Sequence, residues 1–579
     1  MLRLREQFVP AVLALLFLLS VLQLLDVFEV WYYPMIHRWL YSLNFSLGFS
    51  LVPVLLPASF VVIVFLLRWQ RYLEVFLSSS ASFVINYFFG LEAAVACFSF
   101  FLVLLALRCF VGVGGFFFWL FVFLTGLEAA SLSHWLLFLP LGLKTPLESV
   151  AELEMSLFYV ASNLAPYLVL TLIFVCFLKP FNRLFVRMKL TFERLEEQKS
   201  SIFSSRAPFF LFIIFFSVLA AIYPYLPNVN PTGRDIGVDI RNYLESAELI
   251  ENDPSQILKV RYGQRPLIHL VIFVFQKLLN LDALTVIRFL PVLLVPLMAL
   301  TVYFFAKAFF NDNGIAEWAS FFTVFGFPVA VGMFSYYLSN MLGLCLVFSS
   351  LGFLFRAVKG GSRVGLVLAF LFGGLVLFAH PWTFDQYFAP LILIIFILPQ
   401  IFDSELTGFK ISRNILSRAR YIIFFFLVLL FVIELLKRNV FQGYGGIAAL
   451  NTVFRSFTSL QEFWYDLEYP LKERFGGLIF SIVSMGLALI GVLALKLRDV
   501  SEFYLWILMV ATSALFLISG GVVKSRLYYN IPIGVLAALG YVSILNVISS
   551  DELKLSFSSF IFLSMVVYLF RSLANIILK

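Results

Sequence analysis

Charged residues are scarce in this sequence. Only 13% of its 579 residues are Asp, Glu, Lys or Arg, whereas 62% are hydrophobic. Soluble globular domains carry about 25% charged residues, so this composition excludes a soluble fold. The long uninterrupted apolar runs also differ from the short alternating segments of a transmembrane barrel. The sequence therefore predicts an all-α fold, a polytopic transmembrane helical bundle.

Cysteine is rare as well. The chain has four cysteines, which lie in or beside apolar runs without the spacing of metal ligands: Cys97, Cys109, Cys176 and Cys345. We interpret them as buried thiols. The net charge of +8 comes from basic residues at the ends of apolar segments, as the positive-inside rule expects. We therefore predict membrane lipids as neighbours and no nucleic-acid partner.

The apolar runs predict about 17 spans, since a helix needs about 20 apolar residues to cross a bilayer. We expect an N-terminal module of about six spans at 1–180, a basic linker at 181–206, a second membrane module at 207–548 and a terminal span at 549–579. The sixth span is expected at about 157–178, after an acidic stretch between spans that contains Glu148, Glu152 and Glu154.

Sidedness follows from the basic linker, which the positive-inside rule places in the cytoplasm. The next span then runs outward and places residues 227–266 on the external face. The segment after this loop, PLIHLVIFVFQKLLN, is too short for a full crossing and is expected to lie at the interface. The same count brings residues 380–385, 438–475 and 524–526 to the external face, where acids and bases could act together on a charged headgroup.

Two carboxylates in the loop 227–266 are the main candidates for chemistry. Asp235 and Asp239 are four residues apart, so they could share a helix face or converge on one substrate atom. Asp239 also precedes a helical pattern and could serve only as its N-cap. Both readings stay open. A divalent metal ion stays an alternative too, although the spacing does not identify a complete ligand set.

Two further sites are candidates for substrate contact. Lys524 and Arg526 are expected just outside a span at about 527–547, where cations meet lipid phosphate or simply extend to the interface. His380 ends an apolar run, followed by Trp382 and Asp385, and could contact substrate or serve as a structural donor.

Four segments of residues 207–548 resemble the C superfamily of membrane glycosyltransferases (GT-C), of the protein O-mannosyltransferase or aminoarabinose transferase type. The span ending YPYLPN leads into a loop containing GVDIRNY, and RPLIHLVIFVFQKLL is similar to the family's interfacial helix. The runs LTVIRFLPVLLVPLMALTVYFFAKAFF and SYYLSNMLGLCLVF resemble its next spans, and KSRLYYNIP resembles its late arginine and tyrosine motif. The six preceding spans have no counterpart in this pattern.

The resemblance implies a transferase in the cell membrane that uses a polyprenyl or dolichyl phosphate-linked sugar. Asp239 would be the general base at an extracellular active site, with Asp235 assisting, and Lys524 and Arg526 would hold the leaving lipid phosphate. The sugar would move, with inversion, to a hydroxyl of a glycan, lipid or protein acceptor. The remaining candidates would bind substrate: Arg234, Arg241, Tyr243, Arg261, Arg265, His380, Trp382, Asp385, Lys524, Arg526 and Tyr529. A transporter of lipid-linked saccharides and a non-catalytic membrane subunit remain the alternatives.

Overall fold

The computed structural model describes most of the chain from residue 117 onward. The described residues are 117–162, 165–178, 206–263, 265–402, 413–440, 462–463, 465–466, 481–495, 497 and 499–578. The chain forms two compact units, the first from residues 1–126 and 549–560 and the second from 127–548 and 561–579. The contacts described below lie within the second unit. The spans expected before residue 114 and most of the interval 438–475 lie outside the described residues.

The described part is helical, without a β-strand among the residues just given. A helix covers Phe117–Phe138 and ends in the π-helical turn η2 (His134–Phe138). The following helices are α6 (Leu147–Ser162), α7 (Ala165–Leu178), α9 (Arg206–Ile222), α10 (Ile240–Asn252), α11 (Pro266–Leu279), α12 (Ala283–Phe310), α13 (Asn313–Val324), α14 (Phe327–Ser335), α15 (Leu338–Gly360) and α16 (Arg363–Ala379). The last ones are α17 (Pro381–Phe402), α18 (Arg413–Val440), α21 (Ile482–Ala494), α22 (Val500–Ile518), α23 (Gly521–Tyr529), α24 (Ile533–Val547) and α25 (Asp551–Leu578).

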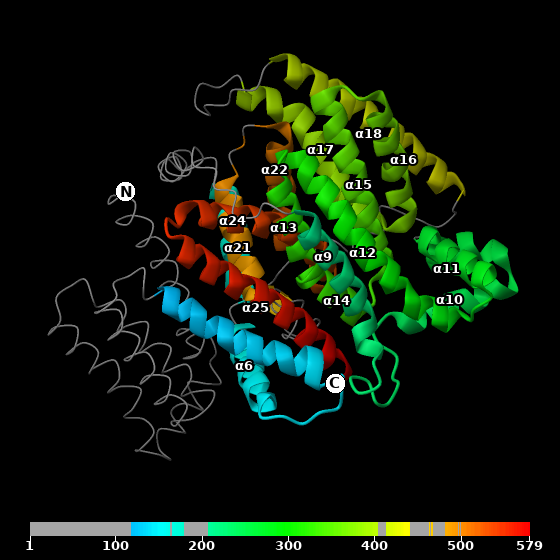
Figure 1. Cartoon of the computed structure of the whole chain (residues 1–579). Helices are drawn as coiled ribbons and strands as arrows, with labels where there is room; N and C mark the ends of the chain where they lie inside the picture. Colours follow the sequence, from blue (N-terminus) through cyan, green and yellow to red (C-terminus); the bar gives the residue numbers. More distant parts are fainter. Residues whose placement is uncertain are drawn as a thin grey trace. The chain divides into compact units, whose positions relative to one another are not determined.

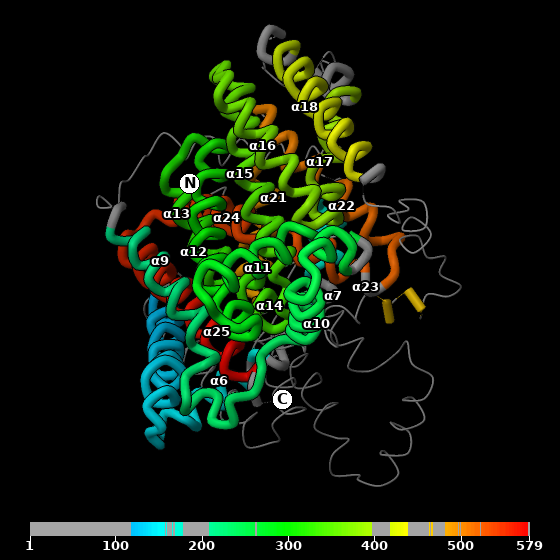
Figure 2. The backbone as a smooth tube through the Cα atoms, turned by 90° about the vertical axis from the view of Figure 1, so that its right-hand side faces the viewer, coloured from blue at the N-terminus to red at the C-terminus, as the bar shows by residue number. Residues whose placement is uncertain are grey.

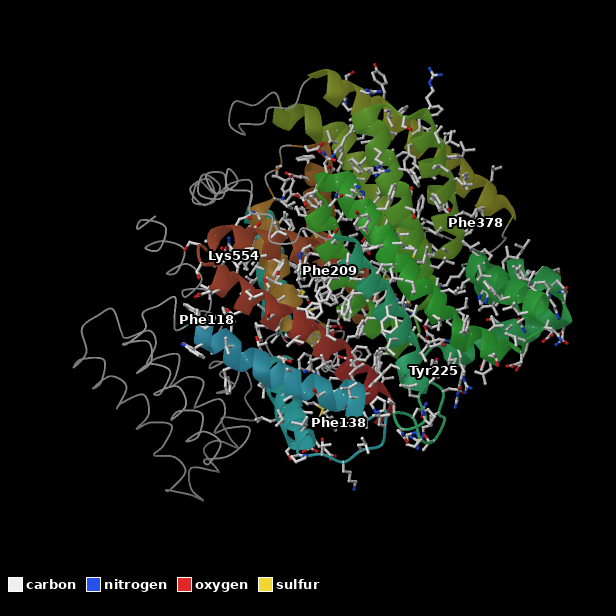
Figure 3. All side chains as sticks on the ribbon, in the orientation of Figure 1. Phe118, Phe138, Phe209, Tyr225, Phe378 and Lys554 are labelled. Atoms are coloured by element: carbon white, nitrogen blue, oxygen red, sulfur yellow. The ribbon has the colours of Figure 1, made fainter. Side chains whose placement is uncertain are left out.

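The core of the second unit is built on α12, α13, α15 and α24. Helix α15 packs between α12 and α16, while α24 packs on both α13 and α21. Figure 1 shows α12, α15 and α16 running side by side. Rings fill the contacts of α9: Phe209, near its start, lies 5.0 Å from the ring of Trp318, and Tyr225 follows its end (Figure 3). This scaffold holds the polar elements at the helix ends.

Eight helices of the described part are long and apolar enough to cross a membrane, or nine if one bent pair counts as a single span. They confirm a multi-pass membrane protein, but the predicted total of about 17 spans is not established. Helix α11 has 14 residues and is about 21 Å long, shorter than the roughly 30 Å hydrocarbon core. Its length agrees with the expected interfacial helix.

The sixth predicted span was wrong in its limits. Two helices, α6 and α7, replace a single helix at 157–178. The acidic stretch expected between spans belongs to α6, and the carboxylate of Glu154 is buried. Helix α7 packs against α21 and α22, and Trp506 of α22 donates a hydrogen bond to the Cys176 carbonyl at 2.9 Å.

The start of the predicted span at 527–547 also needs correction. Lys524 and Arg526 belong to the helix α23 instead of a loop outside the span. Helix α24 follows after a bend of 46° at Asn530–Pro532. Proline lacks a backbone N–H and therefore interrupts the helix at Pro532. The bend allows α23 to leave the direction of α24 and present Arg526 to other elements.

Basic and acidic side chains close one end of the bundle. Lys359, at the end of α15, forms an ion pair with Asp499 just before α22. Its ammonium group also donates to the carbonyls of Ala308 and Phe309 at 3.1 and 2.8 Å. These bonds satisfy carbonyls at the end of α12 that lack partners within the helix. The predicted topology assigns the ends of α12 and α15 and the start of α22 to the same side of the membrane, and in the structure they lie together.

The polar segment 227–263 is ordered, as its apolar residues indicated. It contains α10, followed by the short helices η4 (Pro254–Leu258) and η5 (Val260–Gly263). Helix α10 buries one face, including Ile240, Tyr243 and Ile250, because apolar residues recur at helical spacing. Figure 2 shows α10, α11, α14 and α23 gathered in one region of the bundle, where α10 packs on α11 and α14 packs on α23.

Gly237 fixes the approach of this segment to the α14–α15 junction. Its φ is +93°, and an added Cβ would lie 2.5 Å from the Tyr336 Cβ. We expect Gly237→Ala to lower stability by about 1–3 kcal/mol through overpacking and backbone strain, which a lowered Tm would report. Gly233→Ala is the matched control, since Gly233 has φ +60° but no neighbour in the described part of the chain within 4 Å of the added Cβ. An equal decrease of Tm in both variants would contradict the role of the Tyr336 contact.

Candidate active site

Asp239 is anchored by its backbone at the start of α10. The N–H groups of Val238 and Asp239 donate to the carbonyls of Phe334 and Ser335, each at 3.3 Å. Asp239 occupies the N-cap position of α10, but its side chain makes no capping hydrogen bond. The carboxylate instead accepts a hydrogen bond from the Asn242 side-chain amide at 3.2 Å. The capping interpretation is therefore wrong for the side chain, which is directed to other groups.

Arg526 is the main partner of this carboxylate. Its Nη2 lies 3.5 Å from Asp239 Oδ2, and the two side chains are 13% and 20% exposed, respectively. Nη1 donates to the Asn340 side-chain carbonyl at 3.0 Å, and Cζ lies 3.7 Å from the centre of the Tyr337 ring. The guanidinium is thus held by a carboxylate, an amide and an aromatic face, which fixes its plane.

Buried polar groups support Arg526 from behind. Asn340 donates to the Asn530 side chain at 3.4 Å, and the Asn530 carbonyl accepts a hydrogen bond from Tyr387 at 2.5 Å. Tyr529, a predicted substrate contact, is fully buried. Its hydroxyl donates to the Pro328 carbonyl at 3.0 Å, and its ring meets the Tyr337 ring edge-on at 5.2 Å. Tyr529 therefore lies behind the Arg526 and Tyr337 stack as a support.

Asp235 has a different partner from Asp239. Its carboxylate forms an ion pair with Arg288 of α12, including a hydrogen bond from Arg288 Nε at 3.1 Å. Both side chains of this pair are more than a third exposed. The structure thus places the two loop carboxylates in separate ion pairs, a half-buried one with α23 and an exposed one with α12.

His380 is fully buried between α16 and α17, near three cations. Burial lowers its pKa well below the usual value, and the charges of Arg265, Arg526 and Lys437 lower it further. The imidazole is therefore neutral at neutral pH. Nδ1 accepts a hydrogen bond from the Thr383 N–H at 3.2 Å, which assigns the proton to Nε2. Nε2 has no hydrogen-bond partner among the described residues.

Lys524 lies on α23 with Arg526 but in a different environment. Its side chain is fully buried, with Nζ at 5.2 Å from the Phe463 ring centre and 5.7 Å from that of Phe516. These contacts are cation–π geometry in an apolar setting. The structure therefore brings Arg526, and not Lys524, to the Asp239 carboxylate.

The other predicted site residues differ in their placement. Tyr243 is buried and its hydroxyl both donates to Ser339 Oγ at 3.3 Å and accepts from the Ser339 N–H at 3.2 Å. Trp382 and Arg265 are half-buried, whereas Arg234, Arg241 and Asp385 are exposed. The side chain of Arg261 lies outside the described residues. Arg265 and Arg526 both act electrostatically on His380, and Tyr243 fastens α10 to α15.

Sequence reasoning missed Tyr337 and Asn340, which hold Arg526. Both belong to the segment SYYLSNMLGLCLVF, whose polar residues were attributed only to a span. An amide in an apolar run is costly unless it is hydrogen-bonded, so Asn340 carried a usable signal. Arg288 was missed too, although a charge five residues into the apolar run of α12 is equally unusual.

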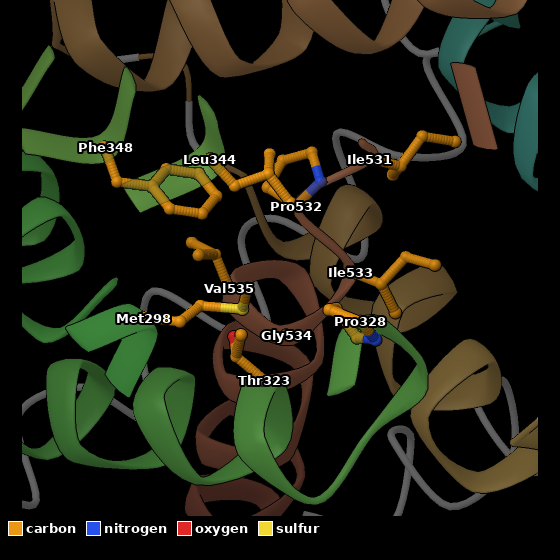
Figure 4. Close-up of a pocket in the computed structure, with 10 residues that line it drawn as sticks. All are labelled: Met298, Thr323, Pro328, Leu344, Phe348, Ile531, Pro532, Ile533, Gly534 and Val535. Carbon is orange, nitrogen blue, oxygen red and sulfur yellow. The ribbon is translucent and has the colours of Figure 1, made fainter. Parts of the chain in front are cut away.

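A small cavity is separate from these residues. It measures about 10 Å³ and is lined mainly by apolar side chains, including Met298, Leu344, Phe348 and Ile533 (Figure 4). This volume is about enough for one water molecule and cannot hold a sugar. Within the described residues, no group of three or more His, Cys, Asp and Glu side chains could hold a metal ion.

Comparison with known proteins gives similarity at the level of the backbone path. No family model matches the sequence, and no curated protein matches it. ArnT from Cupriavidus metallidurans, bound to undecaprenyl phosphate, is 13% identical with a TM-score of 0.44, over 64% of this chain and 77% of ArnT. The Archaeoglobus fulgidus oligosaccharyltransferase, in complex with zinc and sulfate, is 15% identical with a TM-score of 0.42, over 62% of this chain and 53% of that protein.

Proposed function

We propose that this protein is a membrane glycosyltransferase that moves a sugar from a polyprenyl or dolichyl phosphate to an acceptor hydroxyl. The observation that carries the proposal is the 3.5 Å contact between Asp239 and Arg526. It joins the loop motif GVDIRNY to the late motif KSRLYYNIP, the two segments whose resemblance to GT-C enzymes implied the base and the phosphate contact. A carboxylate that can accept a proton thus lies beside a guanidinium suited to a phosphate.

The reaction is a direct displacement. Asp239 accepts the proton of the acceptor hydroxyl as its oxygen bonds to the anomeric carbon of the sugar. The bond between that carbon and the phosphate oxygen breaks, and the electron pair leaves with the polyprenyl phosphate. One displacement at the anomeric carbon inverts its configuration. Asp239 then carries the proton, which it releases to solvent before the next turnover.

Arg526 would stabilise the charge that develops on the leaving phosphate. Its plane is fixed by Asn340 and Tyr337 before substrate binds, so little reorganisation is needed during the reaction. Arg265 and Arg526 both act electrostatically on His380, so Arg265 and the neutral Nε2–H of His380 would donate to remaining phosphate oxygens. Asp235 would contact substrate at the exposed edge of the site, where it pairs with Arg288.

The location and partners of the reaction follow the predicted topology. The polar region containing Asp239 and Arg526 would face the outside of the cell membrane, where the donor headgroup meets a glycan, lipid or protein acceptor. The polyprenyl chain of the donor would lie in the bilayer. The six N-terminal spans would contribute acceptor or lipid contacts.

A vesicle assay tests this function. Purified protein would be reconstituted with a panel of labelled polyprenyl-phosphate sugars and an acceptor extract, and transfer of the label to the extract would be measured. We expect transfer from at least one donor by the wild type and transfer about 10²–10⁴-fold slower by vesicles with Asp239→Asn. Movement of intact donor across the bilayer without transfer would instead establish the transporter alternative.

A further inference from the structure

Three charged side chains are buried together far from Asp239 in the sequence. Glu128 lies in the helix Phe117–Phe138, Glu154 in α6 and Arg571 in α25. They are 8%, 8% and 1% exposed, respectively. Helices Phe117–Phe138 and α25 are both candidate membrane spans. Ionisable groups in such a setting are expensive unless they are paired, and they commonly mark ion or proton sites.

Arg571 is the counter-ion of Glu154. Its Nη1 forms a buried ion pair with Glu154 Oε1, and its Cζ stacks 3.8 Å from the centre of the Phe158 ring. Ser131 donates to the other Glu154 oxygen at 3.5 Å. Glu154 therefore has both a counter-ion and a hydrogen-bond donor, as expected of an ionised buried carboxylate.

Glu128 is the second carboxylate of the same cluster. Glu154 and Arg571 act on it electrostatically, and Ser564 of α25 is its hydrogen-bonding neighbour. Its Oε2 is buried without a hydrogen-bond partner among the described residues, and so is Arg571 Nε. The other titratable neighbours are His134, which interacts with Glu148 and Glu152, and Tyr568, whose ring centre lies 5.9 Å from Arg571 Cζ.

The charges of this cluster do not balance if both carboxylates are ionised. Two carboxylates and one guanidinium leave one negative charge in an apolar interior, at a cost of several kcal/mol for an uncompensated buried ion. Addition of one proton makes the cluster neutral. The proton belongs on Glu128, since Glu154 already pairs with Arg571 and the second oxygen of Glu128 has no partner among the described residues that would stabilise an ionised form.

We propose that Glu128, Glu154 and Arg571 form an intramembrane proton-binding site in which Glu128 holds the proton. This site is independent of sugar transfer. Release of the proton would leave an unpaired charge among the helix Phe117–Phe138, α6 and α25, and would weaken their packing. The cluster therefore makes the stability of this part of the protein depend on pH, with lower stability as pH rises and Glu128 ionises.

Infrared difference spectroscopy of the full-length protein in lipid nanodiscs tests this site. The wild-type minus Glu128→Gln spectrum at neutral pH should contain the C=O stretch of one protonated carboxyl group, which disappears as pH is raised. Glu152→Gln is the matched control, since Glu152 is an exposed carboxylate of α6, and it should leave the band unchanged. Absence of the band from the wild-type minus Glu128→Gln difference at every pH would overturn the proposal.

Thermal unfolding gives an independent readout that does not require activity. The Tm of the wild type should fall as pH is raised from neutral to alkaline, whereas the Tm of Glu128→Gln should change less because its amide cannot ionise. Glu154→Gln should remove the infrared band, since Glu128 would then ionise beside Arg571. A band lost in Glu154→Gln but retained in Glu128→Gln would place the proton on Glu154 and contradict the assignment.

Discussion

Replacement of Asp239 with Asn should reduce sugar transfer by about 10²–10⁴-fold, the usual contribution of a positioned general base. The amide keeps the size of the carboxylate and its ability to accept from Asn242, but it cannot take up the acceptor proton. The loss should therefore appear in kcat, with a KM for the donor close to that of the wild type. Steady-state transfer in vesicles, with the Tm as a check on folding, measures both.

Asp235→Asn is the matched control for this loss. It removes the other loop carboxylate, four residues away, and breaks only the exposed ion pair with Arg288. Exposed pairs contribute about 0–1 kcal/mol to stability, so the variant should fold and retain most of its kcat. An equal loss of kcat in both variants would contradict the assignment of Asp239 alone as the general base.

Arg526→Gln should lower kcat by about 10²–10³-fold, since loss of one preorganised donor to a developing charge has this effect in other enzymes. Lysine should restore only part of the activity, because a single ammonium cannot reproduce the bidentate fork or the stack on Tyr337. The variant also leaves Asp239 and Asn340 without their partner, so the Tm should fall as well. Single-turnover rates at saturating donor separate the loss in the chemical step from weaker binding.

Arg288→Gln serves as the parallel control. Arg288 pairs with Asp235 at the exposed rim and makes no contact with Asp239 in the described structure. Its kcat should stay within a few-fold of the wild type. If Arg526→Gln retained wild-type kcat while Arg288→Gln lost activity, the phosphate would be bound by Arg288 of α12 and not by Arg526.

The sequence predicted the helical membrane fold well because the apolar runs are long and the charges are few. It also anticipated the ordered loop and the short helix at PLIHLVIFVFQKLL. It failed where helices break inside apolar or weakly polar runs. Hydropathy averages over such breaks, so it joined the end of α6 to α7 in one span and left α23 as a loop.

The candidate site was predicted as a set of residues but not as a geometry. Asp239 and Arg526 were both named, yet local spacing could not decide between a cap and a base, because their contact spans the length of the second module. Lys524 and Arg526 looked equivalent in sequence, but helix α23 directs one into an aromatic environment and the other to Asp239. Asn340 and Tyr337 depend on the turn between α14 and α15, which hydropathy does not reveal.

Single-turnover transfer from an anomerically pure, labelled polyprenyl-phosphate sugar tests the central claim most directly. NMR of the product would report its anomeric configuration, and the released polyprenyl phosphate would be counted against it. Displacement assisted by Asp239 predicts an inverted product, one released lipid phosphate per sugar transferred, and about 10²–10⁴-fold slower formation of both products in Asp239→Asn. A product with retained configuration, or equal yields from the wild type and Asp239→Asn, would contradict the account.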